Sequence, residues 1–175
     1  MNVNLIKKRI FIVILLFLFV ILNGCLSNDK EIIQTQLQAY NDEKAFSQNA
    51  LKTIYKNYTE IGEDETVESA SAVKELEIQF KLIEERYTSS DFDEILPCKD
   101  AENFIKFQLD AVRLGKSAVE NISKYYNQDS ASPDWSSSDW YSYISDISNV
   151  YSNFTYSSKR LESIRSTLEK GEPIK

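Results

Sequence analysis

From Lys30 to Leu168 the apolar residues recur at spacings of three and four, which is the pattern of α-helices that bury one side. Four stretches follow this repeat. Their apolar positions are, in chain order, Leu37, Tyr40, Leu51, Ile54, Tyr58 and Ile61; Val73, Leu76, Phe80, Ile83 and Tyr87; Ala101, Ile105, Val112, Val119, Ile122 and Tyr126; and Trp140, Tyr143, Ile147, Val150, Phe154, Leu161, Ile164 and Leu168. The sequence therefore predicts an all-α protein.

Start and stop signals place the ends of these helices. Gly62 and Gly171 stand where the first and last repeats stop, and glycine commonly follows the end of a helix. Ser132 followed by Pro133 predicts the start of the last helix, with serine as the N-cap and proline in the first turn. The expected helices span about 30–61, 66–88, 99–126 and 133–170.

Four amphipathic helices joined by short loops can bury their stripes together in an antiparallel bundle with up-down-up-down topology, which we expect for a single domain of residues 30–175. Gly115 interrupts the third stripe. It marks either the close approach of a neighbouring helix or a position without structural meaning. Ser47, Gln108 and Ser157 also interrupt their stripes, and in the bundle they would meet in a polar middle layer.

The first 24 residues have the composition of a secretory signal. Lys7, Lys8 and Arg9 precede an unbroken apolar run of thirteen residues from Ile10 to Leu22. Because a bilayer-spanning helix needs about 20 apolar residues, this run is too short to cross a membrane and is typical of a signal peptide. We therefore expect the chain to be exported.

The junction Leu22-Asn23-Gly24-Cys25 resembles the lipobox of prokaryotic lipoproteins, with an aliphatic residue three positions before a cysteine and a small residue directly before it. The resemblance implies that residues 1–24 are removed and that the Cys25 thiol carries a diacylglyceryl group. Two acyl chains hold a protein on a membrane firmly, whereas one does so only marginally. Residues 25–29 would then be a lipidated cysteine and a short tether, and the domain would be anchored on the extracytoplasmic side of the cell membrane.

The charge of the mature chain limits its partners. Removal of residues 1–24 removes three of the twenty basic side chains and none of the twenty-seven acidic ones, so the net charge falls to −10. Contacts with nucleic acid or with anionic lipid require clustered Lys and Arg. We therefore expect no nucleic-acid partner and expect the lipid alone to hold the protein on the membrane.

The sequence contains no histidine, which excludes Ser-His-Asp and Cys-His nucleophile arrangements and metal sites that need imidazole. Cys98 has no partner for a disulfide if Cys25 is acylated, and we interpret it as a small apolar residue beneath a loop rather than a reactive thiol. The acidic groups 63–65 and 91–94 match no EF-hand loop. We expect no cofactor, no metal and no enzymatic activity, and the oligomeric state stays open.

Our leading functional hypothesis is a non-catalytic protein-interaction module of the cell envelope. With Cys25 at the membrane, the loops 62–65 and 130–135 would share the distal tip of the bundle, where Trp135, Trp140 and Tyr141 are candidate partner-binding residues because aromatic side chains are enriched in binding hot spots. The alternative for the two tryptophans is that they cover the end of the core.

Two other features leave alternatives open. Ser138, Ser142, Ser145 and Ser152 lie near one side of the last helix, which is either a surface for close packing with a second chain or an uncharged solvent-facing surface. The polar middle layer predicts a second function, a small-molecule or solute-binding domain with its pocket near Ser47, Gln108, Gly115 and Ser157.

Overall fold

The chain is all-α. A computed structural model describes the backbone of residues 3–61, 67–126 and 137–175, and the side chains of residues 29–61, 69–126 and 137–175. The described part holds five helices and no strand: α1 (Val3–Glu60), α2 (Val67–Thr88), α3 (Phe92–Ile95), α4 (Lys99–Tyr126) and α5 (Ser138–Leu168).

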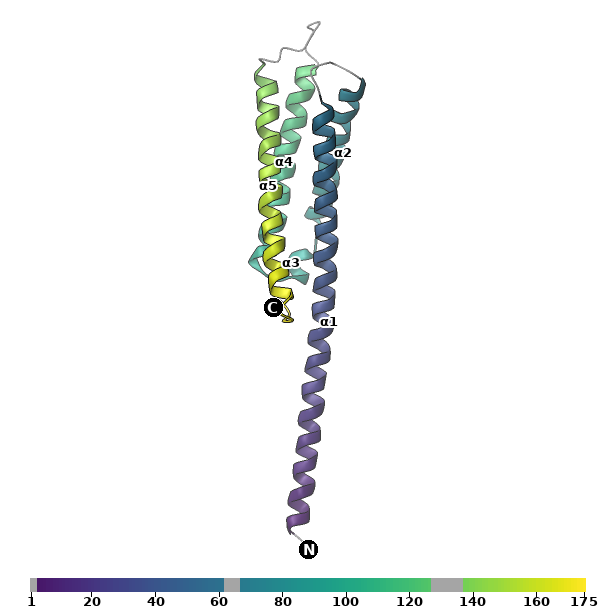
Figure 1. Ribbon diagram of the computed structural model, residues 1–175, viewed down its shortest axis with the longest axis vertical. Helices are drawn as coiled ribbons and strands as arrows, with labels where there is room; N and C mark the ends of the chain where they lie inside the picture. The colour runs from purple at the N-terminus through teal and green to yellow at the C-terminus, as the bar shows by residue number, and fades with distance from the viewer. Residues whose placement is uncertain (1–2, 62–66, 127–136) are drawn as a thin grey trace.

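The four long helices lie side by side as a helical bundle, and α1 extends beyond the others at its N-terminal end (Figure 1). α4 makes its most extensive contact with α5 and also packs against α2, while α1 packs against α2 and α5. The short helix α3 contacts α1 and α4 at the end of the bundle from which α1 extends. Each long helix therefore has two long neighbours.

The helices differ from the sequence-based expectation at three points. α1 begins at Val3 instead of Lys30 and continues through residues 25–29, because Gly24 is the one glycine between residues 3 and 60 and no proline interrupts this stretch. α3 was not expected. α5 begins at Ser138, where the Ser137 side chain accepts a hydrogen bond from the Trp140 backbone N–H at 3.3 Å; the expected cap, Ser132, lies outside the described residues.

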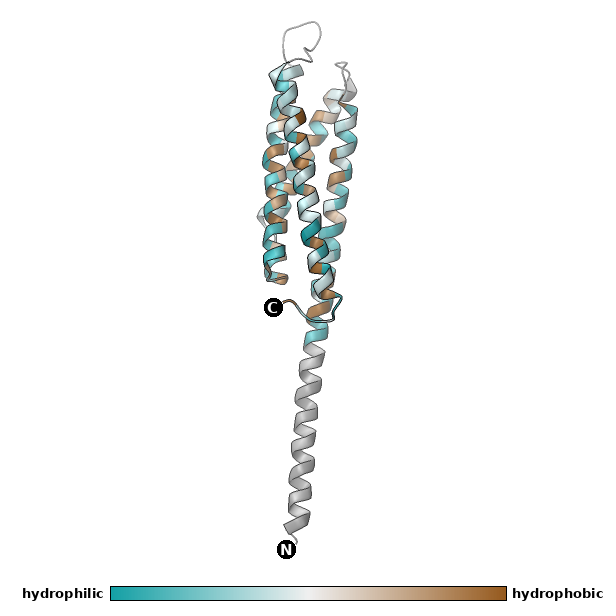
Figure 2. Cartoon of the chain, turned by 60° about the vertical axis from the view of Figure 1, so that its left-hand side comes forward, coloured by the Kyte–Doolittle hydropathy of each residue, from teal (hydrophilic) through white to brown (hydrophobic). Residues whose placement is uncertain are grey.

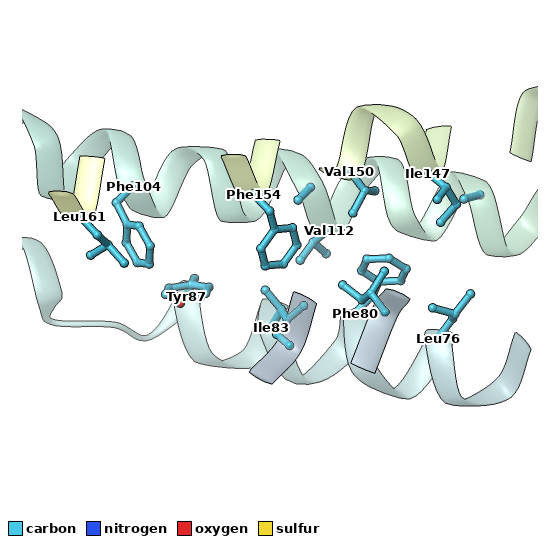
Figure 3. Close-up of a cluster of buried hydrophobic side chains, with 14 of the residues drawn as sticks. Leu76, Phe80, Ile83, Tyr87, Phe104, Val112, Ile147, Val150, Phe154 and Leu161 are labelled. Atoms are coloured by element: carbon cyan, nitrogen blue, oxygen red, sulfur yellow. The ribbon is translucent and has the colours of Figure 1, made fainter. Parts of the chain in front are cut away.

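The core follows the repeats of α2 and α5 closely. Leu76, Phe80 and Ile83 of α2 point toward Ile147 and Phe154 of α5, as Figure 3 shows. All five are essentially inaccessible to solvent. Apolar and polar residues mix along every long helix (Figure 2), as expected when each helix turns one side to its neighbours.

The buried side of α4 is rotated from the predicted stripe. Ile105, Val119 and Tyr126 were expected in the core but are only half-buried. The fully buried positions instead include Phe104 and Tyr125, together with small residues, and the complete buried set is Ala101, Phe104, Gln108, Ala111, Val112, Gly115, Ala118, Ile122 and Tyr125. Small side chains such as these allow neighbouring helices to approach closely.

Gly115 marks a close approach, as one of the two sequence-based interpretations proposed. A Cβ atom at this position would lie 2.2 Å from Cε1 and Cζ of the Phe80 ring. Because the Phe80 side chain is fully buried, its ring has little room to move away. Glycine at position 115 therefore makes room for a phenylalanine of the neighbouring helix.

The buried positions of α1 and the residue that follows it are spaced alternately by four and three residues, but half of them are polar. These positions are Gln36, Tyr40, Glu43, Ser47, Ala50, Ile54, Asn57 and Ile61. Three of the four polar side chains bond to other segments of the chain. Glu43 accepts hydrogen bonds from the Arg86 guanidinium of α2 at 2.6–3.1 Å, Ser47 accepts from Gln108 of α4, and Gln36 bonds to residues 95 and 174.

The packing of Phe80 on Gly115 yields a test of the core. We expect Gly115→Ala to lower the free energy of unfolding by up to about 2 kcal/mol, because overpacking costs about 1–3 kcal/mol and the better helix propensity of alanine returns about 1 kcal/mol. Chemical denaturation measures the change. Lys106→Ala, at an exposed position of the same helix, is the control and should stay within about 0.5 kcal/mol of the wild type.

A second substitution separates crowding from other causes. Phe80→Leu should reduce the additional loss caused by Gly115→Ala, since the two residues are in contact and their effects are therefore not additive. An increase in stability on Gly115→Ala alone, as helix propensity by itself would predict, would show that the ring and the glycine do not pack as described.

Candidate interaction surface

Trp140 belongs to the core at the N-terminal end of α5. Its ring centroid lies 5.3 Å from that of Tyr125 and 5.5 Å from that of Tyr143, and the residue is half-buried. This packing agrees with the alternative interpretation of Trp140, in which tryptophan covers the end of the core. Trp135 lies outside the described residues. Tyr141 points away from the core and is 63% exposed, so it is the one of the three candidates that the structure describes as accessible.

A chain of tyrosines continues from Trp140 to the surface between α1 and α5. Tyr143 lies 6.1 Å from Tyr58, Tyr58 lies 6.1 Å from Tyr151, and Tyr151 lies 6.3 Å from Tyr55, all between ring centroids. Tyr143 is fully buried, whereas Tyr55 is largely exposed. The sequence alone does not identify this contact series, because neighbours on different helices cannot be paired without the topology.

Burial acts on two of these hydroxyls. Desolvation raises the pKa of the Tyr143 hydroxyl well above its ordinary value and raises the pKa of Tyr151 to about 12, since burial penalises the phenolate. Both side chains therefore stay uncharged over a wider pH range than a solvated tyrosine.

The outward side of α5 carries no charge over most of its length. Ten residues between positions 138 and 158 are exposed, and all are uncharged: Ser138, Tyr141, Ser142, Ser145, Ser148, Asn149, Ser152, Thr155, Tyr156 and Ser158. We call this set the neutral α5 surface. The two charged residues in the same stretch, Asp139 and Asp146, are not among the exposed ones, and Asp146 accepts hydrogen bonds from Ser117 and Asn121 of α4.

The outward sides of α2 and α4 differ from this surface. Exposed positions of α2 include Lys74, Glu75, Glu77, Lys81 and Glu85, and those of α4 are mostly charged as well. Between these helices lies a groove of about 550 Å³, lined by Phe80 and Val119 and by polar or charged residues on both sides. Lys116 and Glu84 form an ion pair that links the two helices, with 2.5 Å between Nζ and Oε2.

The polar middle layer is filled by its own side chains. The Gln108 amide nitrogen donates to Oγ of Ser47 at 2.8 Å and to Oγ of Ser157 at 2.9 Å, and all three residues are buried. Phe80 occupies the space beside Gly115. A cavity that touches this layer at Ser47 measures about 30 Å³, which is room for about one water molecule.

The structure describes the side chain of Cys98 but not that of Cys25. The backbone of Cys25 is helical within α1, and its side chain lies outside the described set. Cys98 is half-buried and packs against the core directly before α4, which agrees with its interpretation as a small apolar residue beneath a loop. Of the residues whose placement the structure gives, no group of three or more acidic or cysteine side chains is arranged to hold a metal ion.

Within residues 29–61, 69–126 and 137–175, whose side chains the structure describes, no helix combines the length and the apolar composition needed to cross a membrane. Comparisons of the chain with protein-family models, with curated proteins and with solved structures find no match. The site is therefore interpreted from its own chemistry.

Proposed function

We propose that this chain is a lipid-anchored protein-interaction module on the extracytoplasmic side of a cell membrane, and that it binds another envelope protein through the neutral α5 surface. Residues 1–24 would be a signal peptide, and Cys25 would carry the acyl chains. The long helices α1, α2, α4 and α5 would form an antiparallel up-down-up-down bundle, with α3 closing one end.

The observation that carries this proposal is the absence of charge from every exposed position of α5 between residues 138 and 158, in a chain in which 27% of the residues are charged. Centres of protein interfaces are depleted in charged residues, because each buried charge must be desolvated. The exposed positions of α2 and α4 carry many charged residues. Contact between α5 and a protein partner would explain why its exposed positions from 138 to 158 carry none.

The composition of the surface supports binding to protein. Paratopes of antibodies are enriched in tyrosine, which gives rigid contact area, and in serine and asparagine, which give adaptable hydrogen bonds. The neutral α5 surface consists of the same residue types plus one threonine. Tyr141 and Tyr156 are 63% and 49% exposed and would be its aromatic anchors.

The continuity of α1 supports an orientation in which one end of the bundle faces the membrane and the start of α5 lies at the far end. If Cys25 is acylated, the helix leads from the membrane directly into the bundle, and the neutral α5 surface runs along the body away from the bilayer. Tyr141, near the start of α5, would then lie toward the distal end. A solute-binding function in the polar middle layer has less support, because Ser47, Gln108 and Ser157 bond to one another there.

Introduction of charge tests the surface. We expect Ser145→Lys combined with Ser152→Lys to reduce specific capture of an envelope partner by tenfold or more, since each lysine would have to be desolvated in the contact. Affinity purification from solubilised envelopes, with quantitative mass spectrometry of the bound proteins, measures the loss. Tyr141→Ala should weaken the same capture by removing an anchor.

The matched control is Ser71→Lys, which makes the same change at an exposed position of α2 and should leave capture unchanged. Trp135→Ala tests the distal loop separately. A partner that is captured equally by the wild type and by the double lysine variant would remove the neutral α5 surface from the proposal.

The anchor has its own test. We expect Cys25→Ala to abolish acylation, because alanine has no thiol to which a diacylglyceryl group can be attached. Intact mass spectrometry measures the loss of the acyl mass. A wild-type protein that retains residues 1–24 and lacks an acyl group would contradict the proposed anchor.

A further inference from the structure

Gln36 of α1 binds the backbone of the segment that follows α5. Its side-chain amide nitrogen donates to the Ile174 carbonyl oxygen at 2.7 Å, and its amide oxygen accepts from the Ile174 N–H at 2.9 Å. The same nitrogen donates to the Ile95 carbonyl oxygen at the end of α3, at 3.1 Å. Gln36 is 2% exposed, so these bonds replace hydration that the amide has lost.

The orientation of this amide is set by its partners. Two carbonyl oxygens, those of Ile95 and Ile174, require a donor, and the Ile174 N–H requires an acceptor. A primary amide offers two N–H donors and one oxygen, which match these needs only if the nitrogen faces the carbonyls. The contact with Ile95 therefore holds Gln36 ready to pair with residue 174.

Gln36 recognises the peptide backbone of residue 174 rather than its side chain. One donor and one acceptor of Gln36 meet the acceptor and the donor of a single residue, as a neighbouring strand does when an extended peptide adds to a sheet edge. Selectivity would come from the flanking contacts. Ile174 is half-buried against the core, and the Lys175 ammonium lies 3.5 Å from Oδ1 of Asp29.

The residues after Gly171 are not needed to complete the last turn of α5. The Glu169 N–H donates to the Arg165 carbonyl oxygen, and the Gly171 N–H donates to the Leu168 carbonyl oxygen, so the final turn is complete by residue 171. Gly171 has φ of +75°, which turns the chain out of the helix. The following residues cross to α1 at the end of the bundle from which α1 extends, as Figure 2 shows.

We propose that Gln36, with the Ile95 carbonyl and Asp29, forms a peptide-binding site for an extended segment in which an aliphatic residue precedes a basic one, and that residues 173–175 occupy it in cis. The site lies beyond the C-terminal end of α5, whereas Tyr141 lies in the first turn of that helix, so the site is independent of the neutral α5 surface. Another extended peptide of the same chemistry would have to displace residues 173–175 in order to bind.

The test supplies the segment in trans. A variant of the full chain that ends at Gly171 is titrated with a labelled, end-blocked peptide of residues 171–175, and fluorescence anisotropy measures binding. We expect saturable binding that Gln36→Leu weakens about tenfold or more, because its hydrogen bonds to the ligand are lost. Gln38→Leu is the matched control, since the exposed Gln38 bonds to Asp42 and should not affect the peptide.

A second measurement uses the untruncated chain and does not depend on the folding of the shortened one. The Ile174 amide hydrogen should exchange with solvent about tenfold or more faster in Gln36→Leu than in the wild type, and at the wild-type rate in Gln38→Leu. Equal exchange in all three proteins would overturn the site. If the shortened variant keeps its helicity but does not bind the peptide, the proposal that the site binds a separate peptide is wrong.

Discussion

The arrangement of the bundle depends on one constraint: half of the buried positions along α1 are polar, and burying a polar group without a hydrogen-bond partner is costly. Glu43 meets Arg86 of α2, Ser47 meets Gln108 of α4, and Gln36 meets the segment after α5. An apolar stripe could slide or rotate against its neighbours at little cost. A stripe with these partners fits in one register only, because a shift by one turn would leave several buried groups without bonds.

The contacts that α1 makes also bear on the proposed functions. α1 leads out of the bundle toward Cys25, and its contacts with α2, α5 and the segment after α5 join the expected anchor to the body. α5 turns its apolar residues inward, and Asp146 bonds to α4, which leaves hydroxyl, amide and tyrosine groups facing outward. An acidic protein repels other acidic proteins over most of its surface. The exposed residues of the neutral α5 surface add no such repulsion.

The sequence predicted the all-α fold and the core positions of α2 and α5, because large apolar residues stand at nearly every buried position there. The predicted core was wrong at positions where a polar residue is buried, or where a small residue is buried and a larger apolar neighbour is not. Glu43 is buried, yet an acidic residue cannot be assigned to the core before Arg86 is known to face it. In α4, Ala111 and Ala118 are fully buried but carry too little apolar signal to outweigh Val119, so the predicted stripe was rotated. Tyr141 could be named as a candidate from its residue type, whereas the neutral α5 surface required knowledge of which α5 residues are exposed.

The central claim, that another protein covers the neutral α5 surface in the cell, is tested most directly by residue-resolved chemical labelling. Tyrosine-specific and lysine-specific reagents are applied to intact cells and, separately, to the purified protein, and the modified positions are quantified by mass spectrometry. We expect Tyr141 and Tyr156 to react severalfold less in cells than in the purified protein, while the exposed Lys74 and Lys81 of α2 react equally in both. Tyrosines that react to the same extent in both settings would contradict the account.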